Sequence, residues 1–434
     1  MGQQKRKLSR REFIRQVGAA TTLAAGFPQW ARVASAASGE ALDGTGLSFR
    51  CAAGDVTPTE AVVWLRAERE GVVSVRYGKD PQLKEFVATA PVKVTGDTNF
   101  TAKLLIDRLE PASTYFYQAA VEGKNPGPVA RLTTVPRSDD AVDVRFAFSG
   151  DTRQTYRPFS IMDSIRAMKP DFFLHLGDTI YADLDGRAHT LDQYWAKYRA
   201  NRSDQPSQNL FSETNLYVVW DDHEVENNYH RLSPLAPIGR KAFFDYWPVR
   251  QDAKDPDRIY RSFRWGKAVE LFILDARQYR DREKATLLGQ EQKRWFLDAL
   301  ASSDAWFKFV ATPMPFSSPD ADKWGGFPDE RNEVLGVIKK KKISGVVFLT
   351  ADVHYAAVTR VAGGLGLREF ITGPIAAQMD TKVTGTAKRF EFFKGDVFNY
   401  GLVKVYAKAT PPYAEIEILG KGNELLHKTK IETA

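Results

Sequence analysis

The sequence is poor in cysteine and in long apolar runs. Cys51 is the only cysteine among 434 residues, so the chain cannot form an internal disulfide. Beyond residue 36 no apolar run approaches the ~20 residues that a membrane-spanning helix needs, so we expect no transmembrane anchor. Repeats and low-complexity tracts are also missing. With 43% hydrophobic and 26% charged residues, the composition is that of a globular chain with one large core and a smaller domain.

The excess of positive charge is concentrated at the N-terminus. The chain carries 61 basic and 54 acidic residues, a net charge of +7. Residues 1–36 contain seven of the basic residues and one acid, which leaves 54 basic and 53 acidic residues in the rest. This near balance argues against specific nucleic-acid binding.

Residues 1–36 have the layout of an export signal. Arg10-Arg11 precedes a mild apolar run over 17–27, and Ala34-Ser35-Ala36 has the small residues that a signal peptidase accepts. The arginine pair resembles the twin-arginine signal that directs folded proteins to the twin-arginine export machinery of bacteria. The alternative is a basic amphipathic segment without special meaning. We expect a signal peptide over 1–36 and a periplasmic or secreted protein.

The remaining sequence changes character near residue 140. Residues 42–137 contain short strand patterns separated by Gly, Pro and Asp turns, and they resemble a fibronectin type III-like β-sandwich. From 144 to 434, apolar runs of strand length alternate with helical patterns, which predicts an α/β domain. The predicted strands of this domain are 144–148, 171–176, 216–220, 269–274, 307–311 and 346–350, followed by two antiparallel tail strands over 401–407 and 414–419.

Four of the predicted strands end in acidic motifs. These are Gly150-Asp151, Gly177-Asp178 with Tyr181 three residues on, Asp221-Asp222-His223-Glu224, and Asp352-Val353-His354. Ligands of open α/β sheets lie beyond the carboxyl ends of the strands, so these groups can converge on one site. A single strand-terminal Asp is more often a cap or turn residue. Several carboxylates packed together would repel each other, and multivalent metal is the natural compensation.

The order of these motifs resembles that of the calcineurin-like metallophosphoesterases. Within that superfamily it is most similar to the PhoD-like alkaline phosphatase/phosphodiesterase family, supported by the stretches 176–181, 220–228, 274–281 and 352–354. The likeness extends over nearly the whole chain. It implies an α/β fold (an α+β sandwich) with central sheets flanked by helices, preceded by the small all-β domain.

The resemblance also implies a metal centre. Asp178 would bridge two metals, Asp151, Tyr181 and His354 would complete a ferric site, and Asp222 and Asp352 would hold the second metal. PhoD-like enzymes often have a cysteine at the position of Asp151, whereas the wider superfamily, purple acid phosphatases included, has aspartate. Residues 311–315 lack the histidine usual in the superfamily. The second site is therefore rich in oxygen and favours calcium over zinc, in agreement with the iron–calcium cofactor that the family implies.

The chemistry expected from such a centre needs no Ser or Cys nucleophile. A metal-bound hydroxide at a dinuclear or larger site would attack phosphorus, and His223 would act as general acid or transition-state stabiliser. The structural alternative for His223 is a histidine bonded to Glu224 or to a backbone carbonyl. Arg153 could reach phosphate or form a surface salt bridge, and Asn228 could bind metal or act as a cap.

Three functions stay open. The favoured one is an exported metal-dependent phosphoesterase, of the alkaline phosphatase D type, that hydrolyses small-molecule phosphate esters. The second is a phosphodiesterase or phospholipase D-like hydrolase of phospholipid, nucleotide or wall-polymer diesters. The third is a non-enzymatic extracellular binding protein, which the complete motif set disfavours.

Overall fold

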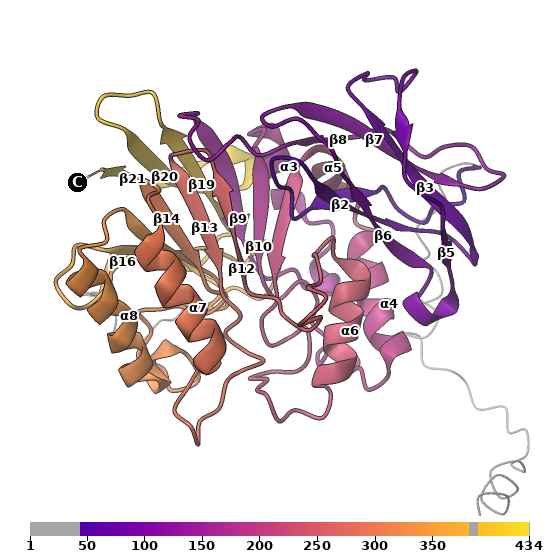
Figure 1. The fold of residues 1–434 in the computed structure, drawn as a ribbon. Helices are drawn as coiled ribbons and strands as arrows, with labels where there is room; N and C mark the ends of the chain where they lie inside the picture. Colours follow the sequence, from indigo (N-terminus) through magenta and orange to yellow (C-terminus); the bar gives the residue numbers. More distant parts are fainter. Residues whose placement is uncertain (1–43, 382–388, 434) are drawn as a thin grey trace, which may run out of the picture. The chain divides into compact units, whose positions relative to one another are not determined.

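The computed structural model describes residues 44–381 and 389–433 (Figure 1). The predicted signal peptide over 1–36 lies outside these residues. Among the helices that the structure describes, none is both long enough and apolar enough to cross a membrane.

The centre of the fold is a pair of β-sheets. The first is a nine-stranded sheet in the order β21 (Leu425–Glu432), β20 (Tyr413–Gly420), β19 (Asn399–Tyr406), β9 (Val144–Ser149), β10 (Phe172–Leu176), β11 (Asn215–Val219), β1 (Ala52–Gly54), β2 (Ala61–Arg66) and β6 (Thr101–Ile106). Strands β9, β10 and β11 are parallel, so their carboxyl ends lie at the same edge.

The second sheet packs face to face against the first. It has seven strands in the order β12 (Arg261–Trp265), β13 (Val269–Ile273), β14 (Phe307–Ala311), β15 (Val346–Thr350), β17 (Arg368–Ile371), β16 (Ala356–Arg360) and β18 (Phe390–Lys394). Aromatic rings fill the space between the sheets: the centroid of Phe146 lies 5.0 Å from that of Phe309, and the rings of Tyr217 and Phe263 are 4.2 Å apart. These aromatic contacts pack the two sheets against each other, so the strand ends of one sheet are positioned relative to those of the other.

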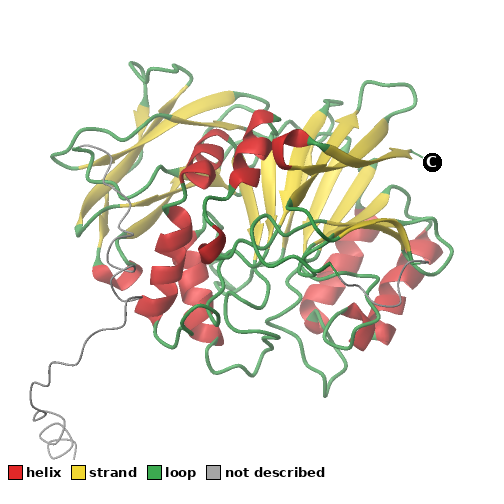
Figure 2. Cartoon of the chain, turned by 180° about the vertical axis from the view of Figure 1, so that it is seen from behind, coloured by secondary structure: helices red, strands yellow, loops and turns green. Residues whose placement is uncertain are grey.

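Helices cover the outer faces of this pair. On the side of the seven-stranded sheet, α7 (Gly289–Ser302) and α8 (Pro328–Lys341) bury Phe296 and Val334 against Phe272 and Phe348. The other helices are α3 (Ser160–Ala167), α4 (Leu191–Arg202), α5 (Gln205–Glu213) and α6 (Ala236–Tyr246). Figure 2 shows helices, in red, on both sides of the yellow strands. The expected arrangement of central sheets flanked by helices is confirmed.

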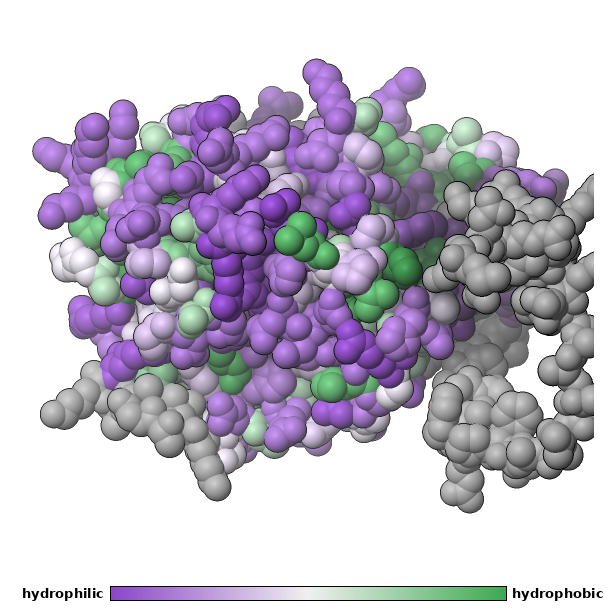
Figure 3. Space-filling view, turned by 90° about the horizontal axis from the view of Figure 1, so that it is seen from below, coloured by the Kyte–Doolittle hydropathy of each residue, from purple (hydrophilic) through white to green (hydrophobic). Residues whose placement is uncertain are grey.

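The N-terminal β-structure shares a sheet with this core. Strand β1 pairs in parallel with β11, with Gly54 opposite Leu216, so β1, β2 and β6 extend the nine-stranded sheet. A separate five-stranded sheet contains β3 (Gly71–Gly78), β4 (Val87–Ala88), β5 (Val92–Val94), β7 (Thr114–Val121) and β8 (Ala130–Thr133). It completes the expected sandwich. The face in Figure 3 is mainly hydrophilic, with hydrophobic side chains in small separate groups.

Candidate metal centre

The four acidic strand ends converge on one site. Three of them follow the parallel strands β9, β10 and β11, and the fourth follows β15 in the facing sheet. Possible ligand atoms lie within 4.8 Å of one another in three overlapping groups, which are Asp151, Asp178 and His354; Asp178, Asp222 and His223; and Asp221, Asp222 and Asp352. The structure thus brings together the predicted carboxylates and both motif histidines.

The backbone turns sharply at several of these residues. Asp151, Asp178 and Asp352 have φ values of 68°, 52° and 70°, in the left-handed region that non-glycine residues seldom occupy. Gly373 lies beside Asp151 with a φ of 112°, and a Cβ at that position would come within 2.2 Å of Asp151 Oδ2. Strain of this kind collects at functional sites, where the surrounding structure maintains it.

Asp151 fits a metal ligand best. Its side chain is 1% exposed, and neither carboxylate oxygen has a hydrogen-bond partner among the described residues. Burial, together with the nearby charge of Asp352, raises the pKa of Asp151 well above its usual range. A buried carboxylate without a partner is unfavourable, so these oxygens suit a cation that neutralises them.

Tyr181 and His354 lie beside Asp151. The Tyr181 hydroxyl is 2.9 Å from His354 Nε2, and His354 Nε2 is 3.8 Å from Asp151 Oδ1. Burial and the charges of Asp178 and Asp151 raise the pKa of the Tyr181 phenol well above its ordinary value. The oxygen and nitrogen atoms of Asp151, Asp178 and His354 lie close enough together to hold one metal ion.

Asp222 and Asp352 share their environment with two cations of the protein. The fully buried guanidinium of Arg277 places Nη2 3.1 Å from Asp352 Oδ1 and 3.5 Å from Asp222 Oδ1, and its Nε contacts Asp221. Lys323 Nζ contacts Asp352 Oδ2. Burial raises the pKa of Asp352, but Lys323 and Arg277 outweigh it, and the pKa lies below its usual value. Both oxygens of Asp352 therefore have cationic partners, and its role as a metal ligand stays a prediction.

Glu224 supports the backbone of the centre. Its carboxylate accepts hydrogen bonds from the backbone N–H groups of Asp178 at 3.2 Å, Thr179 at 2.5 Å and Asp221 at 2.9 Å. It is fully buried and ties the turn after β10 to the turn after β11. One alternative for His223 was a hydrogen bond to Glu224. This bond is not among the hydrogen bonds of Glu224 with the described residues.

His223 is held by a different carboxylate. Its Nδ1 lies 2.6 Å from Asp183 Oδ1, and its ring packs on Tyr181 with 4.4 Å between centroids. Among the described residues, Nε2 makes no hydrogen bond. A cavity of about 200 Å³ is lined by Tyr181, His223, His354 and Arg153, among others. Burial lowers the pKa of His223, but Asp222 and Asp183 outweigh it, and the pKa is raised, which favours the protonated ring.

With this geometry in hand, the chain can be compared with known families. The profile described as PhoD-like phosphatase matches residues 146–397, and that described as PhoD-like phosphatase, N-terminal domain, matches residues 32–136. The chain belongs to the PhoD-like phosphatase family. The resemblance seen in the strand-end motifs is thereby confirmed.

Individual relatives of this PhoD-like chain agree with the assignment. It is 28% identical over 370 residues to alkaline phosphatase D of Bacillus subtilis (strain 168). The aligned part covers 70% of this chain and 63% of that protein's length. The solved structure of PhoD superposes with a TM-score of 0.78 at 21% identity, covering 91% of this chain and 93% of that one. The structure of purple acid phosphatase PPD1 of yellow lupin superposes with a TM-score of 0.69 at 14% identity, and the match covers 88% of this chain and 73% of that one. These two structures support the fold alone.

Two residues of this PhoD-like site that the sequence left open have defined contacts. Arg153 donates to Asp185 through Nε at 2.8 Å and through Nη2 at 2.6 Å, and it also lines the 200 Å³ cavity. Of the two alternatives for Arg153, the salt bridge is therefore present. The backbone N–H of Asn228 donates to Asp222 Oδ2 at 2.5 Å, which orients that carboxylate.

Sequence reasoning missed three residues that shape the site. Asp183, two positions after Tyr181, binds His223, and that short spacing was the available signal. Arg277 lies two residues after Asp275, which accepts its backbone N–H at 3.0 Å, while its guanidinium contacts Asp221, Asp222 and Asp352. Lys323 lies in the loop after β14 and has no motif around it.

Proposed function

We propose that this PhoD-like phosphatase is a metal-dependent phosphoesterase that hydrolyses phosphate esters of small molecules. The observation that carries the proposal is the convergence of Asp151, Asp178 and His354 around two buried oxygens of Asp151 without hydrogen-bond partners among the described residues. His223 also belongs to one of the groups of possible ligands, and its assignment as proton donor rests on Asp183, which holds Nδ1 and leaves Nε2 for the substrate. Neither feature serves the fold, and both serve phosphate chemistry.

The residues fit the metals that the family implies. Asp151, Tyr181 and His354 would hold ferric iron, Asp178 would bridge, and Asp222 with Asp352 would hold calcium. Ions bound there would polarise phosphate oxygens, neutralise charge in the transition state and acidify water near neutral pH. Arg277 and Lys323 contact Asp352 from the protein side, so a calcium ion at the second position would share that carboxylate with them.

The protein's own contribution to bond cleavage is the proton of His223. Asp183 holds Nδ1, and Nε2 is left for the leaving oxygen of the ester. A positioned acid is worth about 10²–10⁴-fold in rate. Arg153, at the same cavity, is suited to contact an ester oxygen while it remains paired with Asp185.

The experiment that tests this function combines metal analysis with a substrate screen. Purified protein should contain iron and calcium, lose activity on chelation and regain it only when both are restored. The screen compares p-nitrophenyl phosphate with bis(p-nitrophenyl) phosphate, since the same centre can serve monoesters or diesters. Stoichiometric zinc without iron would contradict the metal assignment. Loss of activity in Asp178→Asn, with activity retained in the exposed control Asp163→Asn, ties the hydrolysis to the centre.

We further propose that the chain is exported folded by the twin-arginine machinery to the periplasm or medium. The support is the layout of Arg10-Arg11 and Ala34-Ser35-Ala36. Replacing both Arg10 and Arg11 by lysine should leave the precursor in the cytoplasm, as cell fractionation would detect. Normal export of that double variant would contradict the proposal.

A further inference from the structure

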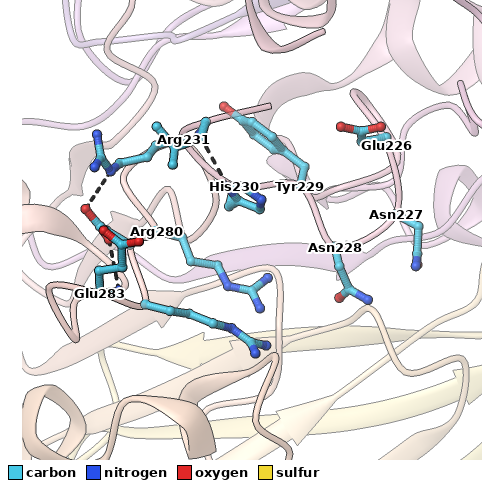
Figure 4. Close-up of a pocket in the computed structure, with 11 residues that line it drawn as sticks. Glu226, Asn227, Asn228, Tyr229, His230, Arg231, Arg280 and Glu283 are labelled. Carbon is cyan, nitrogen blue, oxygen red and sulfur yellow. Dashed lines mark hydrogen bonds and ion pairs between the residues drawn. The ribbon is translucent and has the colours of Figure 1, made fainter. Parts of the chain in front are cut away.

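A second, larger cavity adjoins the candidate centre. Its volume is about 520 Å³, and it is lined by residues of the segments 226–232 and 280–283 (Figure 4). Asn228 belongs to this lining, and its backbone N–H contacts Asp222 Oδ2, so one wall of the cavity borders a predicted metal ligand. The cavity is distinct from the 200 Å³ cavity that His223 lines.

Arg280 is the unusual member of the lining. The residue is 3% exposed, and its Nε and Nη1 atoms are buried without a hydrogen-bond partner among the described residues. Its guanidinium also forms no ion pair there. In Figure 4 the side chain of Arg280 extends into the space that His230 and Asn228 border. Burial, together with the charges of Arg277 and Arg282, lowers the pKa of Arg280 to about 10, so the group stays charged at neutral pH.

The other charged groups of the lining are already engaged or exposed. Arg231 Nε lies 2.6 Å from Asp281 Oδ2, and Arg282 donates to the carbonyl of Ala321 at 3.3 Å. Glu226 pairs with Arg187. Glu283 is exposed. Arg280 is thus the buried cation of this lining that forms no ion pair with the described residues, and Asp322 and Asp222 act on it only without direct contact.

A buried, charged guanidinium without acceptors is unfavourable unless a ligand supplies them. Its planar fork of N–H donors matches carboxylate and phosphate oxygens. The cavity is much larger than one phosphate group, and His223 lies at the other cavity, where the scissile ester belongs. The geometry therefore points to an oxyanion on another part of the substrate.

We propose that the Arg280 cavity binds a second anionic group of the substrate, a carboxylate or phosphate that is not hydrolysed. This inference rests on the proposed phosphoesterase function and narrows its substrates to esters that carry two anionic groups. His230 and the amide of Asn228 supply further polar contacts to the same group.

The test uses matched substrates that differ only in the second anion. One pair is 1,3-propanediol monophosphate and 1,3-propanediol bisphosphate, and the other is glycerol 1-phosphate and 3-phosphoglycerate, so the two pairs separate phosphate from carboxylate. We expect a higher kcat/KM for the doubly anionic member of at least one pair. Arg280→Gln should reduce that preference by about 10- to 100-fold, the effect of a charge-assisted hydrogen bond. The control Arg258→Gln, whose arginine pairs with Asp252 away from this cavity, should keep it.

Two results would overturn the proposal. One is an equal fall of kcat/KM for both members of each pair in Arg280→Gln, which would assign Arg280 to the scissile phosphate or to the fold. The other is a wild-type enzyme without any preference for the second anion. If Arg280→Gln does not fold, Arg280→Lys can be used, because lysine keeps the positive charge without the planar set of N–H donors. This variant should lose part of the preference for the doubly anionic substrate.

A binding measurement separates this inference from the function on which it rests. Calorimetry would compare 1,3-propanediyl bisphosphonate with propylphosphonate, neither of which is hydrolysed. The bisphosphonate should bind more tightly to the wild type, and the difference should shrink in Arg280→Gln. If no ester is hydrolysed, the phosphoesterase function fails, while this difference still decides the role of Arg280.

Discussion

Nδ1 of His223 lies 2.6 Å from Oδ1 of Asp183. The second oxygen of the same carboxylate accepts the backbone N–H of Asn227 at 2.9 Å. Asp183 therefore joins the loop after Tyr181 to the loop after β11 and fixes the orientation of the imidazole. A carboxylate at Nδ1 keeps the proton there and leaves Nε2 to exchange a proton with a ligand.

His223→Ala should retain its metal ions and lower kcat by about 10²–10⁴-fold. The loss should be smaller for an activated aryl phosphate than for an alkyl phosphate, because a good leaving group departs without protonation. Steady-state kinetics on both esters, with elemental analysis of the same sample, checks this. Equal losses would indicate a phosphate-positioning or structural role for His223.

Asp183→Asn should lower kcat by about 10-fold or more, yet by less than His223→Ala, because the ring remains but its orientation and tautomer are no longer fixed. Metal content should not change, since Asp183 is not among the grouped possible ligands of the described residues. Asp192→Asn, an exposed position on α4, is the matched control. Wild-type kinetics in Asp183→Asn would show that the contact does not matter for the reaction.

The sequence could predict that these acidic groups come together, because each of them follows a buried strand within a few residues. Asp151, Asp178 and Asp222 occupy the ends of β9, β10 and β11, and their register in a parallel sheet follows from local patterns. Asp352 also follows a predicted strand, but the sequence did not indicate that this strand belongs to a second, facing sheet. The N-terminal strands were also predicted, but not the pairing of β1 with β11, because strand pairing between distant segments leaves no local signal.

Other features could not be predicted for physical reasons. Lys323 reaches Asp352 from a loop, and nothing in a loop's sequence determines where a long side chain ends. Strand β21 was missed because its residues are exposed or half-buried, and its sequence, Leu-Leu-His-Lys-Thr-Lys-Ile-Glu, lacks a clear apolar face. The vacant hydrogen-bonding capacity of Arg280 is visible only when the distances to every described neighbour are known.

Asp151→Asn should stabilise the metal-free protein while weakening metal binding. The buried carboxylate has no hydrogen-bond partner among the described residues and is repelled by the charge of Asp352. Its raised pKa means that its negative charge opposes folding at pH values above the usual pKa. Replacing this carboxylate by a neutral amide should raise the free energy of unfolding of the metal-free protein by about 1–3 kcal/mol at pH 7. Thermal unfolding of both proteins in chelator, and in separate samples with added metal and no chelator, checks this. A metal-free variant less stable than the wild type would contradict this account.

Arg277→Gln, in contrast, should destabilise the metal-free protein. Arg277 is buried against Asp221, Asp222 and Asp352, so its removal leaves three carboxylates without their shared cation. Loss of one partner from a buried ion pair costs about 3–5 kcal/mol. Chemical denaturation should show this loss, and added calcium should recover part of it if Asp222 and Asp352 bind that ion. Arg258→Gln, in a half-exposed pair, should be close to the wild type.

Cys51 should take no part in metal binding or reactivity. The residue is 2% exposed in the N-terminal β-structure, and burial raises the pKa of its thiol to about 11. At pH 8 roughly one thiol in a thousand is ionised, and the thiolate is the reactive form. The thiol of the native protein should therefore not react with an aromatic disulfide reagent. After unfolding in guanidinium, each chain should react once and release one equivalent of the reagent's thiolate. Cys51→Ala should keep the iron content and the visible spectrum of the wild type. Loss of iron in that variant would mean that a thiolate, and not the oxygen donors at Asp151 and Tyr181, holds the metal.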